Sequence, residues 1–367
     1  MSATRNLLIA AFAWAASSAA PAQAEILIGL AGPMSGEKAW RGDQLRHGAQ
    51  MAVADINAAG GVLGERVRLI VADDACDPEQ AVAVAHKMVA DGVIFVDGHN
   101  CSSASIAASK IYEAAGILQI SPSSTNPKFT DEGGANVFRV CGRDDQQGIV
   151  AGNYLADNWA EKKIAIVHDG STYGKGLADI TRSQLNKRGV TETVVGTYEA
   201  GAMDFSGLVS ELKEKEIGVV YVGGYASDAS LIIREARDSG SALQLVSGDA
   251  MTTEEFWLTA GPAGEGSLFT FGPDPRQNPG AAKVTAQFMA INYDPSGYTL
   301  NSYGSVQVWA QAVEKAGKLE LDAVIESLRG NNFETVLGNI AFDAKGDITA
   351  PAYVWYSWTD GKYVLVK

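Results

Sequence analysis

Residues 98–127 read GHNCSSASIAASKIYEAAGILQISPSSTNP, and this stretch contains the same sequence pattern twice. An apolar strand pattern, first at 93–96 and then at 117–120, runs into a cluster of small hydroxyl residues. The first cluster sits where a helix should begin, so that free backbone N–H groups, the positive end of the helix dipole and serine hydroxyls face outward together. These donors favour a small anion such as a carboxylate. Ordinary N-capping of a βα turn explains one such cluster, whereas two on successive strand ends favour a binding site. The clusters are Ser102, Ser103 and Ser105, then Ser121, Ser123, Ser124 and Thr125.

The size and charge of the chain narrow the class of protein. It has 367 residues, which suggests two domains, and 46% of them are hydrophobic, which is ample for two cores. The formal net charge of −14 argues against a nucleic-acid partner, which would require a basic face. We expect a soluble, weakly associating protein that is monomeric.

The first 24 residues have the pattern of a secretory signal peptide. Arg5 supplies the positive start, residues 7–16 form a short apolar core, and Ala22-Gln23-Ala24 is a small-residue cleavage site before Glu25. The apolar core is too short to cross a bilayer, and no later segment reaches about 18 apolar residues. An uncleaved anchor is the alternative. The pattern predicts an exported, periplasmic protein.

An exported protein permits disulfides, and three cysteines follow the signal segment. Cys76 and Cys101 each come after the end of an apolar strand pattern, and neighbouring parallel strands would bring those ends together. A bridge there would stabilise the fold by roughly 3 kcal/mol. Cys141 is then expected to be a buried free thiol. The alternative, a cysteine metal site, lacks the paired C-x-x-C spacing, so no metal is expected.

Strand and helix patterns alternate from Glu25 onward. Strands that are apolar throughout, separated by helices of 12 to 16 residues, predict βαβ units and a parallel sheet, with the first long helix at 43–58. The pattern restarts near residue 138, which gives a second α/β domain, and breaks at the turn-rich segment 272–275. Three later helices cannot build a domain alone, so they should complete an earlier one. The chain would then cross between two Rossmann-like lobes more than once.

The sequence offers no recognisable catalytic pair, nucleotide loop or metal motif, so neither an enzyme nor a cofactor is expected. Polar and aromatic residues instead follow the strand ends, where an open α/β sheet places its ligands. Hydroxyls in the first lobe could hold a carboxylate, and an acidic residue in the second could hold an ammonium, so a zwitterion fits. Surface packing of each tyrosine, and a simple turn at Asp249, are the alternatives. The residues are Asn100, Ser102, Ser123, Ser124, Thr125, Tyr173, Tyr225 and Asp249.

Taken together, these segments resemble the periplasmic solute-binding proteins of ABC importers of the leucine/isoleucine/valine-binding type. The resemblance covers the whole chain after the signal segment. The motifs that carry it are GPMSG (32–36), GDQ (42–44), ADINAAGGVLG (54–64), DDACDP (73–78), GHNCSS (98–103), ISPSSTNP (120–127), FRVCGRDDQQG (138–148), IAIVHDGSTYGKGLA (164–178), VYVGGY (220–225) and FDAKGD (342–347).

The resemblance implies the type I fold of this family, two Rossmann-like lobes joined by three crossovers that close on an amino acid. Residues 25–142 and 273–350 would form the first lobe, and 143–272 and 351–367 the second. Ser102 would bind the ligand carboxylate with Thr125 and the backbone around Ser123. Tyr173 would cap the ligand, Tyr225 would line the cleft, and Asp249 would bind the α-ammonium. Cys76 and Cys101 match the family's disulfide, and the partner would be an ABC permease in the inner membrane.

The sequence departs from the family pattern at the side-chain pocket. Arg41, preceded by Trp40, stands where an aromatic residue is common, and Asn100 stands where an apolar one is frequent. Tyr298 lies in another pocket-lining segment and could shorten the pocket. Cationic and amide walls are costly for a leucine side chain. The alternative is that Arg41 points to solvent and Trp40 replaces the aromatic.

The sequence therefore predicts an amino-acid-binding component of an ABC importer, for a branched-chain or other small amino acid. A polar, acidic or ω-amino acid such as γ-aminobutyrate is the alternative ligand. An amino-acid or amide-sensing receptor is the alternative role.

Overall fold

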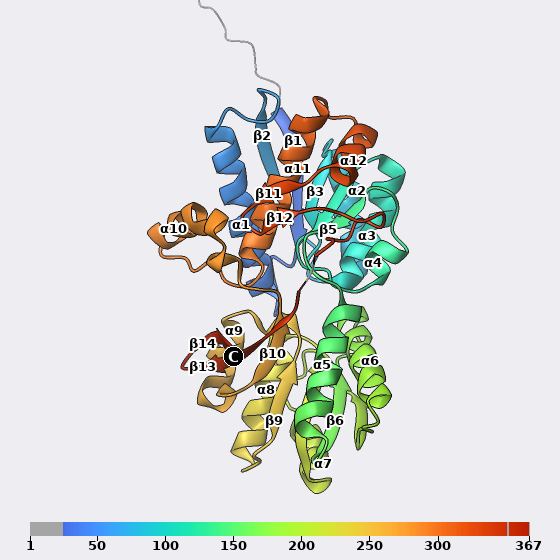
Figure 1. The fold of residues 1–367 in the computed structure, drawn as a ribbon, viewed down its shortest axis with the longest axis vertical. Coiled ribbons are helices and arrows are strands. Elements are labelled where there is room, and N and C mark those ends of the chain that lie inside the picture. Colours follow the sequence, from blue (N-terminus) through green and yellow to red (C-terminus); the bar gives the residue numbers. More distant parts are fainter. Residues whose placement is uncertain (1–24, 351, 367) are drawn as a thin grey trace, which may run out of the picture.

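A computed structural model describes residues 25–350 and 352–366, so the predicted signal segment 1–24 lies outside the described residues. The molecule is elongated, with one lobe above the other in Figure 1. The first sheet has five parallel strands in the order β2-β1-β3-β4-β5. The strands are β1 (Glu25–Gly32), β2 (Arg66–Asp73), β3 (Phe95–Gly98), β4 (Leu118–Ser121) and β5 (Val137–Arg139), and the helices between them are α1 (Ala39–Ala58), α2 (Pro78–Ala90), α3 (Ser102–Ala115) and α4 (Lys128–Asp131).

The second sheet has seven strands in the order β14-β13-β10-β9-β8-β6-β7. Strands β6 to β10 pair in parallel, while β13 and β14 join the edge as an antiparallel hairpin. The strands are β6 (Lys163–His168), β7 (Val194–Thr197), β8 (Ile217–Gly223), β9 (Gln244–Ser247), β10 (Leu268–Phe271), β13 (Val354–Thr359) and β14 (Lys362–Leu365). The helices are α5 (Asp144–Trp159), α6 (Thr172–Lys187), α7 (Ser206–Glu214), α8 (Ala226–Asp238) and α9 (Glu255–Ala260). The predicted α/β fold with two parallel sheets is confirmed.

The three late helices lie in the upper lobe with the first sheet (Figure 1). They are α10 (Ala282–Ala290), α11 (Thr299–Ala316) and α12 (Leu321–Gly330), followed by the short antiparallel pair β11 (Phe333–Thr335) and β12 (Gly338–Ile340). Helix α11 packs against α1 and β3, where Trp309 stacks on Phe95 with ring centroids 5.1 Å apart. Because of this packing we retain residues 25–142 and 273–350 as the proposed first lobe.

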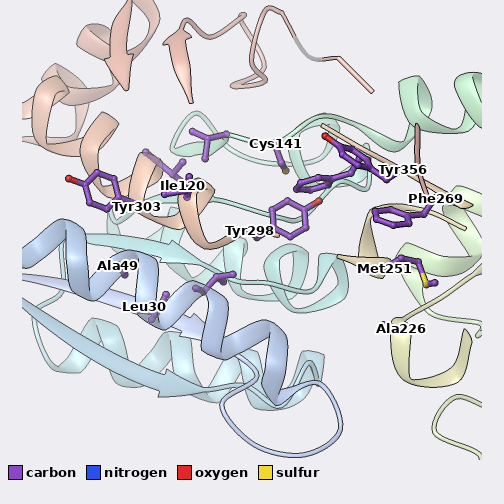
Figure 2. Packing of buried hydrophobic residues seen from close by; sticks show 14 of the residues in the cluster. Leu30, Ala49, Ile120, Cys141, Ala226, Met251, Phe269, Tyr298, Tyr303 and Tyr356 are labelled. Carbon is purple, nitrogen blue, oxygen red and sulfur yellow. The ribbon is translucent and has the colours of Figure 1, made fainter. Parts of the chain in front are cut away.

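The chain passes between the two sheets after β5, after β10 and again before β13. Aromatic residues fill the region around these crossings. Figure 2 shows Tyr298 and Cys141 on the side of the first lobe, facing Phe269 and Tyr356 of the second. The ring of Tyr298 lies edge-on to Phe271, with centroids 5.1 Å apart. The hinge is therefore packed with aromatic side chains.

A buried ion pair ties two of these crossings together. Arg139, at the end of β5, donates from Nε to Oδ1 of Asp347 over 2.6 Å, and Arg143 donates to Oδ2 of the same carboxylate over 2.7 Å. Burial of an arginine is tolerated where such hydrogen bonds satisfy its charge. Residues 343–347 (DAKGD) are thus a turn that supplies a hinge contact.

Candidate ligand-binding site

A small cavity of about 170 Å³ lies between the lobes. The side chains of the two lobes nearly fill this space. Seven residues line it, all of them predicted site residues, although their binding of a ligand stays a prediction. They are Arg41, Asn100, Ser102, Ser123, Tyr173, Tyr225 and Asp249.

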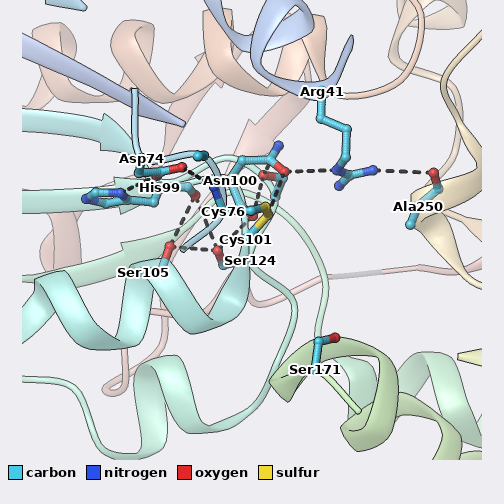
Figure 3. The surroundings of a disulfide bond; sticks show 12 residues. Arg41, Asp74, Cys76, His99, Asn100, Cys101, Ser105, Ser124, Ser171 and Ala250 are labelled. Carbon is cyan, nitrogen blue, oxygen red and sulfur yellow. Dashed lines mark hydrogen bonds and ion pairs between the residues drawn. A yellow bond between two sulfur atoms is a disulfide. The ribbon is translucent and has the colours of Figure 1, made fainter. Parts of the chain in front are cut away.

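The wall from the first lobe is held by hydrogen bonds within the serine clusters, as Figure 3 shows around Asn100. The carbonyl oxygen of His99 accepts from the hydroxyls of Ser105 over 3.1 Å and Ser121 over 2.8 Å. That of Asn100 accepts from Ser123 over 3.1 Å. The side-chain amide of Asn100 also donates to Oγ of Ser123 over 3.0 Å. These bonds fix the two strand-end loops against each other.

Ser102 occupies the first position of α3 and faces the cavity. Its Oγ accepts from the backbone N–H of Asn126 over 3.2 Å, which leaves its own hydrogen available to a ligand. No side chain caps the start of α3, since Cys101 makes no side-chain cap hydrogen bond. A carboxylate placed here would meet a hydroxyl donor and the positive end of a helix.

The wall from the second lobe carries a negative charge. Asp249 follows β9 and is 1% exposed. Its Oδ1 accepts from the hydroxyl of Tyr173 over 2.9 Å, and its Oδ2 accepts from the hydroxyl of Tyr298 over 2.5 Å. Burial and the charge of Asp249 raise the pKa of both tyrosines well above the ordinary value, so both hydroxyls remain protonated donors. A buried carboxylate held only by neutral donors is able to attract an ammonium group.

Polar contacts join the lobes around the cavity. The side-chain amide of Gln44 donates to the carbonyl of Thr252 over 3.2 Å, and that of Asn126 donates to the carbonyl of Thr172 over 2.8 Å. Arg41 extends from α1 towards the carbonyl of Ala250, which Figure 3 shows clearly. The lobes are therefore closed on each other at the site.

Helix α1 begins at Ala39, four residues before the predicted helix, and this places Trp40 and Arg41 on its first turn. Adjacent helical residues point roughly 100° apart, so both cannot face the cavity. Arg41 is 4% exposed and lines the cavity, whereas Trp40 is 45% exposed and lies on the outer surface. In this geometry Trp40 does not line the cavity, and Arg41 does not point to solvent. The role of either residue in ligand binding stays a prediction.

Three other predicted residues lie beside the cavity rather than on its wall. The hydroxyl of Ser124 contacts Oγ of Ser105 at 2.7 Å and donates to the carbonyl of Asn100 over 3.0 Å, so it braces the loop instead of facing a ligand. Thr125 is fully buried, and its hydroxyl has no hydrogen-bond partner among the described residues. Tyr298 reaches the site through its hydrogen bond to Asp249 and through the contact of its ring with Arg41.

Asp144 is the residue that the sequence reading missed. It opens α5, is fully buried, and neither carboxylate oxygen has a hydrogen-bond partner in the part of the chain described. Burial, and then the charge of Asp249, raise its pKa well above the ordinary value, so this carboxyl is stabilised in its neutral form. Its only sequence signal is the acidic start of a helix, which commonly indicates no more than a favourable helix dipole.

The predicted disulfide is confirmed. Cys76 and Cys101 are bonded, with their Cα atoms 5.4 Å apart, and Cys141 is a buried free cysteine. The bridge holds the start of α3 to the loop after β2. Beside it, the buried Asp74 and His99 lie 2.6 Å apart, which adds a second link between the same two loops. Ser102 thus follows a doubly anchored loop.

A family model described as periplasmic binding protein matches residues 25–362. The chain belongs to this family. It is 45% identical over 350 residues to the Leu/Ile/Val-binding protein homolog 1 of Brucella melitensis, with 94% of each chain covered. It is 46% identical over 346 residues to an amino acid binding protein of Pseudomonas aeruginosa, covering 93% of this chain and 92% of the relative.

A solved structure shows the same fold. It is a branched-chain amino acid transporter substrate binding protein from Streptococcus pneumoniae in complex with isoleucine. The TM-score is 0.84 at 28% identity, covering 93% of this chain and 98% of the other. The resemblance drawn from the sequence motifs is confirmed, and the family is one of binding proteins rather than enzymes.

Proposed function

We propose that this periplasmic binding protein is the amino-acid-binding component of an ABC importer, and that its ligand lies between the two lobes. One observation carries the proposal: the donors of Ser102 and the start of α3 face the buried carboxylate of Asp249 across one small cavity. A molecule with a carboxylate at one end and an ammonium at the other complements both walls. The names of the relatives, which are binding proteins for amino acids, support the same class of ligand.

The hydroxyl groups of the first lobe would hold the ligand carboxylate while the lobes are apart. Closure would then bring Asp249, Tyr173 and Tyr225 against the ammonium and the rest of the molecule. Because these contacts exist only in the closed form, the ligand would shift the equilibrium towards closure by its extra affinity for that form. An inner-membrane permease would distinguish the closed form from the open one and receive the ligand. We further propose that the protein is exported with removal of residues 1–24 and acts as a monomer.

A thermal-shift panel tests the proposal. The chain from Glu25 onward is heated with each of the twenty L-amino acids and with simple carboxylates that lack an ammonium group. A ligand present at about 100 times its Kd stabilises the folded state by about 2.7 kcal/mol, which gives a clear increase in Tm. We expect at least one amino acid to do this and no simple carboxylate to match it. Stabilisation by a carboxylate alone would contradict the role of Asp249.

A further inference from the structure

The guanidinium of Arg41 is buried at the cavity without a counter-ion. Its Nε donates to Oδ1 of Asn100 over 2.9 Å, and Nη1 donates to the carbonyl of Ala250 over a long 3.4 Å. Within residues 25–350 and 352–366, no carboxylate forms an ion pair with it. A guanidinium has five N–H donors, so most of those in Arg41 are unused. Buried charges are ordinarily paired, because an unpaired one costs several kcal/mol.

The nearby acidic residues do not act as a counter-ion to Arg41. Asp249 lines the same cavity, but both of its oxygens accept from tyrosine hydroxyls. Glu255 experiences the positive charge of Arg41 as an attraction, yet burial still raises its pKa to about 7, so its carboxylate is only partly ionised at neutral pH. The two hydrogen bonds that Arg41 donates are to neutral oxygens. The positive charge is thus available to a ligand.

Neighbouring side chains hold Arg41 in place. Its guanidinium carbon lies 5.4 Å from the ring centroid of Tyr225 and 5.6 Å from that of Tyr298, within the range of cation–π attraction. Asn100, which accepts from Nε, is itself anchored by its bond to Ser123. Asn100 and Tyr298 belong to the same proposed lobe as Arg41, so these two contacts would hold its donors in position before a ligand arrives, which lowers the ordering cost of binding. The contact with Tyr225 would form only on closure.

The cavity wall also lacks the surface that an aliphatic side chain requires. Each of its seven residues carries a hydroxyl, amide, carboxylate or guanidinium group, and none is aliphatic. A leucine side chain at this wall would cover the guanidinium of Arg41 and the amide of Asn100 without offering either group a hydrogen bond. Desolvating a polar group in this way costs about 1–3 kcal/mol, and more for a charged one.

We propose that Arg41 and Asn100 bind a carboxylate at the side-chain end of the ligand, so that the preferred substrates are acidic amino acids. This rests on the amino-acid site proposed above and specifies its substrate class. The α-carboxylate meets Ser102 and the start of α3, the ammonium meets Asp249, and the second carboxylate accepts two parallel hydrogen bonds from Arg41. Bidentate arginine–carboxylate pairs are among the strongest polar contacts in proteins.

Isothermal titration of the wild-type chain with matched ligands tests the assignment. Glutamate and aspartate are compared with glutamine and asparagine, which have nearly the same shape without the charge, and with leucine and γ-aminobutyrate. We expect the better acidic ligand to bind at least about 10-fold more tightly than its amide and than leucine, since a charged hydrogen bond adds about 1.5–3 kcal/mol. A leucine that binds more tightly than both acidic ligands would overturn the proposal. A γ-aminobutyrate that binds more tightly than glutamate would also overturn it, because that ligand has no α-carboxylate.

Variants of Arg41 test whether this residue causes the preference for acidic ligands. Arg41→Met keeps an unbranched side chain and should weaken the acidic ligand about 100-fold or more. Leucine should bind more tightly to this variant than to wild type, because it no longer covers a charged group. Arg41→Lys keeps the charge without the planar fork and should lose about 10-fold. Arg46→Met removes a positive charge from the exposed side of the same helix and is the control. It should change neither the affinity for the acidic ligand nor the affinity for leucine.

Different results would overturn the role of Arg41 and the amino-acid site itself. Equal losses of leucine and glutamate in Arg41→Met, with an unchanged circular dichroism spectrum, would remove Arg41 from ligand selection while leaving the amino-acid site intact. Binding of no amino acid by the wild-type chain would overturn the amino-acid site itself.

Discussion

The two walls of the cavity differ in how their polar groups are satisfied. On the first lobe, the hydroxyls of Ser105, Ser121 and Ser123 satisfy the carbonyls of residues 99 and 100, and a disulfide anchors the loop. On the second lobe, Asp249 keeps a buried carboxylate among neutral tyrosines. The first wall is preorganised by internal bonds, whereas the second carries a charge that a ligand would neutralise. We infer that the first wall sets ligand orientation and the second supplies most of the gain on closure.

Asp249→Asn is expected to have the largest effect on affinity. It removes the charge that faces the ammonium but keeps the shape. The amide oxygen can accept from one tyrosine hydroxyl, and the amide NH2 group can donate to the other. Loss of one partner of a buried charge pair costs about 3–5 kcal/mol, so affinity for the best amino acid should fall by at least about 100-fold in calorimetric titration. Asp179→Asn, which removes a half-exposed carboxylate of the same lobe, is the matched control. Equal affinity of wild type and Asp249→Asn would end the assignment of the ammonium site.

Ser102→Ala tests the first wall and should have a smaller effect. The variant removes one hydroxyl donor, while the backbone N–H groups at the start of α3 remain. A hydrogen bond to a charged group contributes about 1.5–3 kcal/mol, so a loss of about 10- to 100-fold is expected. Ser103→Ala alters the next residue, which does not line the cavity, and should bind as wild type. If the two alanine variants bind equally well, the carboxylate lies elsewhere.

Removal of the disulfide separates stability from affinity. In Cys76→Ser/Cys101→Ser, the free energy of unfolding measured in urea should fall by roughly 3 kcal/mol, because the cross-link no longer restricts the unfolded chain. Affinity should fall by only about 2- to 5-fold, since the serine hydrogen bonds still hold the loop. Addition of a reductant should lower the stability of wild type but not that of the variant. A loss of affinity as large as that of Ser102→Ala would mean that the bridge, rather than the serines, preorganises the wall.

The sequence predicted the parts of the site that depend on strand ends, because parallel strands place their carboxyl ends on one edge of the sheet. It therefore named Ser102, Tyr173 and Asp249, which line the cavity, although their binding of a ligand stays a prediction. It could not orient Trp40 and Arg41, because α1 starts after Lys38, which makes no side-chain cap bond, so the sequence has no marker for the first turn. Asp144 was missed for a related reason. Its burial depends on how the hinge packs around the start of α5, which no local pattern encodes.

Helices α10, α11 and α12 also show which features the local sequence predicts and which depend on contacts between residues far apart in the chain. Their existence followed from periodicity, and the need to bury an apolar face predicted that they complete an earlier domain. Their assignment to the first lobe came from the family resemblance. The ion pairs of Asp347 with Arg139 and Arg143 join residues more than 200 positions apart, as their separations of 208 and 204 show. Nothing in the local sequence of residues 342–347 distinguishes this hinge contact from an ordinary surface turn.

Asp97→Asn is expected to have the smallest effect on affinity. It alters a buried residue behind the first wall of the cavity. Asp97 lies at the end of β3, fully buried, and burial raises its pKa to about 8. The hydroxyl of Ser302 is 2.8 Å from the carbonyl of Leu45 and 2.5 Å from Oδ2 of Asp97. A hydroxyl has one hydrogen, so both contacts are satisfied when Ser302 donates to Leu45 and a protonated Asp97 donates to Ser302.

This geometry fixes the sign of a pH effect on stability. Between about pH 4, where an unfolded aspartate ionises, and about pH 8, the folded state binds the extra proton, so the contribution of Asp97 to stability falls as pH rises. The asparagine variant donates to Ser302 at every pH and lacks this dependence. In urea unfolding, its stability relative to wild type should therefore increase from pH 5 to pH 8, while ligand affinity stays within about 2-fold because Asp97 does not line the cavity. Parallel stability curves for the two proteins would show that Asp97 is ionised in the folded state across this range.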